Sequence, residues 1–124
     1  MIKRFFPPIA ICIILFSNSC THKTDVASIR EIFFGLDIQP IVAGNCTQSG
    51  CHNDRGDARF PLITYNDVIS RGGVNASDAR GSKFYKVISN HSGGRPMPPP
   101  PLPLLSSDQI KLVYIWIEQG AKNN

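Results

Sequence analysis

The sequence predicts an all-α fold of three to four short helices joined by long loops rich in proline and glycine. The segment 106–119 shows the clearest helical signals: a serine cap, a broad apolar face and a glycine stop. Ten prolines and ten glycines among 124 residues indicate extended loops between the helices. No two segments alternate apolar and polar residues convincingly enough to pair as strands. A chain of this length has room for one small domain.

The first two helices are short and are predicted from their caps. Asp37 is the expected N-cap of a helix over 37–42, where Pro40 is tolerated because the first turn needs no donor from it. Thr64 is the expected N-cap of a second helix, and Asp67 completes a pattern like a capping box. The inward faces would carry Ile38, Ile41 and Val42 in the first helix, and Tyr65, Val68 and Ile69 in the second.

The last two helices carry the most apolar faces. A third helix is expected over 82–89. The fourth begins at Ser106 as N-cap, with Gln109 at the third position of a capping box, and Gly120 ends it where a left-handed residue is favoured. The apolar positions are Phe84, Tyr85, Val87 and Ile88 in the third helix, and Ile110, Leu112, Val113, Ile115, Trp116 and Ile117 in the fourth.

The N-terminus has the anatomy of an export signal. A basic pair at positions 3–4 precedes an apolar run over 9–16, which is far too short to span a bilayer as a helix. Small polar residues then lead into Cys20, a pattern that resembles the lipobox of bacterial lipoproteins, in which the cysteine is acylated. The alternative is an ordinary signal peptide cleaved nearby, with Cys20 incidental. Both interpretations place the mature domain outside the cytoplasm.

The expected organisation is a signal peptide over 1–19, a lipidated cysteine and tether over 20–35, and a folded domain over 36–124. It describes a periplasm-facing or outer-membrane lipoprotein of a Gram-negative bacterium, held at a membrane by its lipid anchor. Of the 13 Lys and Arg residues, Lys3 and Arg4 leave with the signal, so 11 remain against 9 acidic residues. This small excess without a basic run gives no reason to expect nucleic-acid binding.

Export changes how the four cysteines are interpreted. Cys12 lies inside the signal peptide and Cys20 is the expected lipid carrier, so Cys46 and Cys51 are the two left for the folded domain. Free thiol pairs seldom persist in an oxidising compartment. These two are therefore expected to be bridged, bound to metal or covalently occupied.

The octapeptide 45–52, N-C-T-Q-S-G-C-H, has the composition of a covalent haem-attachment motif. Such motifs use two thiols to bind the porphyrin vinyl groups and a histidine directly after the second cysteine as proximal iron ligand. Cys51 and His52 show that adjacency, whereas four residues separate Cys46 from Cys51 in place of the usual two. The extra residues must bulge outward, and Gly50 gives the backbone freedom to do so.

Two other arrangements of these residues stay open on the motif alone. A Cys46–Cys51 disulfide would close a small loop in an exported protein. A metal site could use both cysteines, His52 and either His91 or His22, although no second ligand pair has the spacing of a structural zinc site.

Met97 is the candidate for a sixth iron ligand. It is the only methionine left after the signal is removed, and Pro96 and Pro98 on either side stiffen a loop that can be neither helix nor central strand. A thioether ligand favours ferrous iron and raises the reduction potential. His91 is a rival sixth ligand, but its polar loop favours a solvated side chain. Arg95 is either a partner of a haem propionate or a surface residue.

With these motifs identified, the segment 37–121 resembles the small cytochrome c domains of exported proteins from Bacteroidetes and planctomycetes. The resemblance implies an all-α fold around one covalently bound haem c, with Cys46 and Cys51 as attachment residues and His52 and Met97 as axial ligands. The matching pieces are residues 37–41, 82–88, 97–99 and 116–121.

The expected function is therefore one-electron transfer with other redox proteins at an extracytoplasmic membrane face. Two protein ligands leave no open position on the iron, so neither a small-molecule substrate nor enzymatic turnover is expected. One rival is a disulfide-bridged structural or interaction module on a lipoprotein, and another is a peroxidase-like enzyme in which Met97 leaves the iron. The haem would also stabilise a small core by packing against Ile41, Val42, Phe60, Leu62, Val87, Leu102 and the C-terminal helix.

Overall fold

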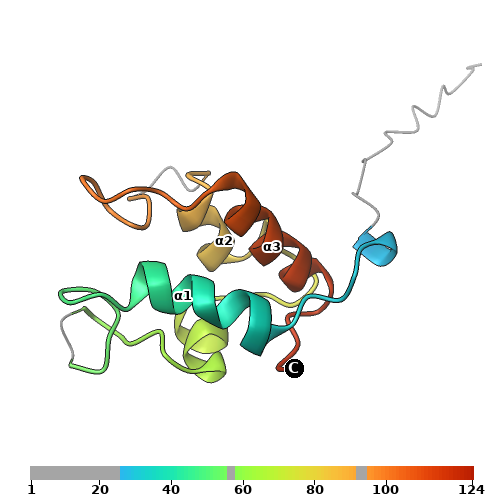
Figure 1. Cartoon of the computed structure of the whole chain (residues 1–124), viewed down its shortest axis with the longest axis horizontal. Coiled ribbons are helices and arrows are strands. Elements are labelled where there is room, and N and C mark those ends of the chain that lie inside the picture. Colours follow the sequence, from blue (N-terminus) through green and yellow to red (C-terminus); the bar gives the residue numbers. More distant parts are fainter. Residues whose placement is uncertain (1–25, 56–57, 92–94) are drawn as a thin grey trace, which may run out of the picture.

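The computed structural model describes residues 26–55, 58–91 and 95–124, which form helices and no strand (Figure 1). This confirms the all-α prediction at the level of secondary structure. The expected signal peptide, Cys20 and His22 lie outside the described residues. Within the described ranges, no helix is long and apolar enough to cross a membrane. The elements are η1 (Val26–Ser28), η2 (Phe34–Ile38), α1 (Gln39–Cys46), η3 (Asp67–Arg71), α2 (Lys83–Ile88) and α3 (Ser107–Glu118).

The first helix is longer than the sequence predicts at both ends. A π-helical turn, η2, runs directly into α1, so helical structure extends from Phe34 to Cys46. Pro40 has no N–H to bond to the preceding turn, and that turn widens so that the Gln39 N–H reaches the Phe34 carbonyl. The prediction that Asp37 is the N-cap is wrong. Its carboxylate lies inside η2 and accepts the Phe33 N–H at 2.8 Å.

The second and third helices begin as expected. The Thr64 hydroxyl accepts the Asp67 N–H at 3.2 Å, and the Asp67 carboxylate accepts the Thr64 N–H at 3.0 Å. The Thr64 N–H, followed by the Thr64 hydroxyl at 2.8 Å, donates to this carboxylate and lowers the pKa of Asp67. Helical residues follow Thr64 and continue as the π-helical turn η3. α2 follows Ser82, with Phe84 and Ile88 buried in the core.

Both ends of α3 confirm the predicted capping. The Ser106 side chain accepts the Gln109 N–H while the Gln109 side chain accepts the Ser106 N–H, which completes a capping box. At the other end, Gly120 has a φ of +100°. Its N–H donates to the Ile117 carbonyl, and the Ala121 N–H donates to the Trp116 carbonyl at 2.9 Å. This is a Schellman motif, which satisfies carbonyl groups that the helix end would leave unpaired.

Two glycines should respond in opposite directions to replacement by alanine. Gly120→Ala forces a side chain into a left-handed conformation and should lower the free energy of unfolding by about 1–2 kcal/mol. Gly44→Ala adds a methyl group inside α1, where a Cβ meets nothing within 4 Å, and should raise it by up to about 1 kcal/mol. Urea denaturation of both variants tests this, and equal effects would contradict the assigned helix boundaries.

The helices pack around one hydrophobic core, to which η2, α1, η3, α2 and α3 all contribute. α1 continues from η2, which also packs on α3, and α2 packs on α3 (Figure 1). Phe34, Tyr65 and Trp116 form an aromatic cluster, with Phe34 5.2 Å from Tyr65 and 5.6 Å from Trp116 between ring centroids. The end of the chain returns to the same region, where the Asn124 carbonyl accepts the Gly35 N–H at 3.0 Å. The C-terminal end of α1 and one face of α2 both line a cavity beside this core.

Candidate functional site

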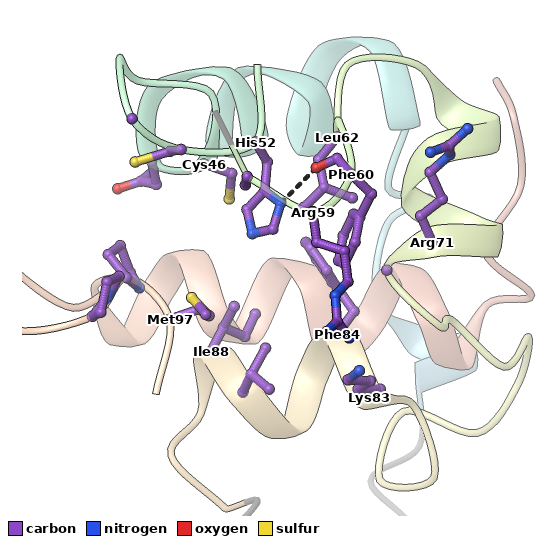
Figure 2. A pocket seen from close by; sticks show the side chains of 18 residues that line it. Cys46, His52, Arg59, Phe60, Leu62, Arg71, Lys83, Phe84, Ile88 and Met97 are labelled. Carbon is purple, nitrogen blue, oxygen red and sulfur yellow. Dashed lines mark hydrogen bonds between the residues drawn. The ribbon is translucent and has the colours of Figure 1, made fainter. Parts of the chain in front are cut away.

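A cavity of about 370 Å³ lies between the C-terminal end of α1 and the inner face of α2 (Figure 2). We call it the central pocket. Its volume falls in the range of small-molecule and cofactor sites, and most of its lining is apolar. All four of the residues predicted to hold haem contribute to its wall. The lining comprises Asn45, Cys46, Gly50, Cys51, His52, Ala58, Arg59, Phe60, Leu62, Arg71, Gly72, Lys83, Phe84, Val87, Ile88, Met97, Pro98 and Pro99.

His52 is held with one ring nitrogen available to the central pocket. Its Nδ1 lies 2.8 Å from the Phe60 carbonyl oxygen, which can only accept a hydrogen bond, so Nδ1 carries the proton. In the neutral imidazole the lone pair is then on Nε2, the tautomer that binds a metal. The Phe60 ring packs against the imidazole, with 4.6 Å between the ring centroids, and restricts the orientation of the imidazole. Figure 2 shows the His52 ring directed into the cavity.

The long spacing between the cysteines is accommodated by a closed loop. The His52 N–H donates to the Cys46 carbonyl at 2.8 Å, which brings the two ends of the insertion together. The Cys51 N–H donates to the Gln48 carbonyl at 2.9 Å, and Gly50 takes a φ of +81°, a conformation that favours glycine. Four residues between the cysteines are therefore compatible with both thiols lining the same pocket.

The two thiols differ in their surroundings. Cys46 is 9% exposed at the end of α1, whereas Cys51 is half-buried, and both are free thiols. Burial raises the pKa of the Cys46 thiol to about 11, and the proximity of Cys51 contributes further. Cys46 is accordingly a neutral thiol at pH 7.

This difference predicts unequal alkylation in the protein without a cofactor. Cys51 should react with iodoacetamide several-fold faster than Cys46 at pH 8, because Cys46 is buried and protonated there. The Cys46 rate should keep rising up to about pH 11, the pKa of its thiol. Mass spectrometry of Cys46→Ser and Cys51→Ser variants separates the two rates. Equal rates, or a Cys46 rate that levels off near pH 8, would show that Cys46 is not buried in solution.

Met97 reaches the central pocket from the side opposite His52. Its N–H donates to the Val87 carbonyl at 3.0 Å, which ties the proline-rich loop to the end of α2. Pro98 and Pro99 line the cavity beside it. In Figure 2 the His52 ring enters from the α1 side and the Met97 side chain from the α2 side, with the cavity between them. A planar group between the two side chains would receive a nitrogen ligand on one face and a sulfur ligand on the other.

The other residues singled out in the sequence lie partly in the central pocket and partly outside it. His91 is exposed and lines a separate groove between α2 and α3, away from the central pocket. Arg95 is exposed and is not part of the lining. Of the residues expected to pack against haem, Phe60, Leu62 and Val87 line the central pocket, whereas Ile41, Val42 and the apolar face of α3 are buried in the core and Leu102 is 46% exposed.

The sequence did not reveal several parts of the pocket wall. These are the Phe60 carbonyl that orients His52, and the cations Arg59, Arg71 and Lys83. No motif marks them, because a backbone carbonyl is independent of residue type and surface cations occur throughout the chain. Gly72 is also part of the wall, where a Cβ would lie 2.3 Å from the Val68 carbonyl oxygen. Because Gly72 directly follows η3, a larger residue there would clash with the last turn of η3.

Among the residues that the structure describes, no three His, Cys, Asp or Glu side chains converge closely enough to hold a metal ion. Searches with protein-family models, the curated proteins and the solved structures find no match to this chain. The central pocket and its residues are therefore the basis on which a function is assigned.

Proposed function

We propose that this chain is an extracytoplasmic electron-transfer protein that holds one covalent haem c in the central pocket. The observation that carries the proposal is the meeting of His52, Met97 and two free thiols in one apolar cavity, although Met97 lies 45 positions after His52 in the sequence. His52 Nε2 and the Met97 sulfur would hold the iron of the haem, one from the α1 side and the other from the α2 side of the pocket. Haem supplies the one-electron couple between ferrous and ferric iron.

The residues of the chain have distinct parts in this proposal. Cys46 and Cys51 would hold the haem through thioethers, formed by addition of each S–H across a vinyl double bond, so that no oxidant would be consumed. The Phe60 carbonyl holds the imidazole of His52 in the ligating tautomer. The apolar walls keep water away from the group, which favours the less charged ferrous state. Ligation on both faces suits electron exchange with redox partners and leaves no position for a substrate.

The absorption spectrum tests the proposal. The chain should be expressed with a bacterial haem-attachment system, and the purified protein should show a Soret band and the sharp visible bands of a low-spin reduced haem. A His52→Ala variant should lose the low-spin spectrum, whereas His91→Ala, which changes an exposed residue outside the pocket, should keep it. A folded wild-type protein without a Soret band would overturn the proposal and favour a Cys46–Cys51 disulfide.

A further inference from the structure

Among the residues that the structure describes, cations are the only charged side chains in the wall of the central pocket. Arg59, Arg71 and Lys83 contribute to the lining, and the described residues of that lining include no Asp or Glu. The other side chains of the wall are mostly apolar. A pocket of this composition suits a ligand whose body is apolar and whose edge is negatively charged.

Two of the three cations are available for such an edge. Arg71 is paired within its own helical turn, with its Nε 3.3 Å from an Asp67 carboxylate oxygen. In the described part of the chain, Arg59 and Lys83 have no salt bridge to an acidic side chain. Both are exposed overall, so each sits at the rim with part of its charge in water. A rim cation of this kind can bind a carboxylate without the large desolvation cost of a buried pair.

Arg59 and Lys83 come from opposite walls of the central pocket. Arg59 belongs to the segment between His52 and η3, and Lys83 is the first residue of α2. Figure 2 places both on the side of the cavity away from Cys46. Lys83 is held there by its N–H, which donates to the Gly73 carbonyl at 2.9 Å, and a Cβ on Gly73 would lie 3.1 Å from the Lys83 Cβ. The two cations are thus at one end of the pocket and Cys46 is at the other.

We propose that Arg59 and Lys83 form the carboxylate-binding end of the central pocket and receive the two propionate groups of the haem. This inference rests on the proposed function and adds the orientation of the group, with its vinyl edge at the thiols and its acidic edge at the two cations. Arg95, which the sequence left as either a propionate partner or a surface residue, is not part of the pocket wall. Arg59 and Lys83 would then connect the α1 side to the α2 side through the bound group.

The test compares ferric haem with its dimethyl ester, which lacks both negative charges. The parent protein is the full mature chain with Cys46→Ala and Cys51→Ala, so that binding is reversible and can be titrated by absorption. The parent should bind haem at least about tenfold more tightly than the ester, because hydrogen bonds between charged partners are the strong ones. Adding Arg59→Gln and Lys83→Gln together should remove most of that difference. Arg55→Gln, which alters an exposed arginine outside the lining, should retain it.

The outcomes separate this inference from the proposed function. Equal affinity of the parent for haem and ester, or a preference unchanged by the double substitution, would overturn the carboxylate-binding end while haem binding itself stands. Binding of neither compound by a folded parent would overturn this inference, whereas the proposed function is overturned by a folded wild-type protein without a Soret band. Circular dichroism of each variant establishes that the affinities are compared between folded proteins.

Discussion

Replacing Met97 with alanine should remove the methionine–iron charge-transfer band from the ferric absorption spectrum and lower the reduction potential. The thioether of Met97 reaches the central pocket opposite His52, and a thioether stabilises ferrous iron relative to ferric iron. Axial ligation spans roughly 0.8 V of haem potentials, so we expect a decrease on the order of 0.1 V. Optical spectroscopy and a potentiometric titration of the haem-loaded protein measure both effects.

His91→Ala is the matched control for the Met97 substitution. His91 was the rival sixth ligand in the sequence, and the structure places it in the groove between α2 and α3. Its replacement should leave the band and the potential unchanged. Loss of the band in His91→Ala, with its retention in Met97→Ala, would reverse the ligand assignment. New peroxidase activity in Met97→Ala is expected only if the iron position that Met97 leaves stays open.

Replacing Trp116 with alanine should be the most destabilising single change in the core. Trp116 is fully buried, packs against Phe34 and donates its Nε1–H to the Lys122 carbonyl at 3.0 Å. Truncation of a buried tryptophan costs about 3–5 kcal/mol, a large share of the roughly 5–15 kcal/mol of a small domain. Trp116→Phe retains most of the ring volume and loses the hydrogen bond, so its cost should be smaller.

Urea denaturation measures these changes, with Leu36→Ala as the control. Leu36 is 78% exposed, and truncation of an exposed side chain should alter the free energy of unfolding by no more than about 0.5 kcal/mol. A loss below about 1 kcal/mol for Trp116→Ala would contradict the central position of the aromatic cluster in the core.

Helix ends that depend on local chemistry could be predicted from the sequence. The capping boxes at Thr64 and Ser106 and the left-handed Gly120 are encoded within a few residues, and the structure has all three. The start of the first helix could not be predicted in this way. The Phe34 N–H donates to the Asn124 side chain, 90 residues away along the chain, and no local pattern reports such a contact.

The residues of the candidate site also divide into those that the local sequence predicts and those that long-range packing determines. Cys46, Cys51, His52 and Met97 were identifiable because each belongs to a short motif or stands alone in the mature chain. The shape of the pocket around them depends on how α1 and α2 pack, which places Lys83 on its wall and leaves Leu102 exposed. The cations on the pocket wall therefore include Arg59 and Lys83 and not Arg95. Short motifs therefore identified the residues proposed to bind haem, whereas the residues around them are determined by how the helices pack.

The mass of the intact denatured protein tests the central claim most directly. The chain should be produced with a bacterial haem-attachment system and unfolded before measurement, which removes any group that is not covalently bound. The account predicts the mass of the mature polypeptide plus one haem, because both thioethers form by addition and release nothing. A mass two hydrogens below that of the polypeptide alone would show a Cys46–Cys51 disulfide in a chain without haem, and would contradict the account.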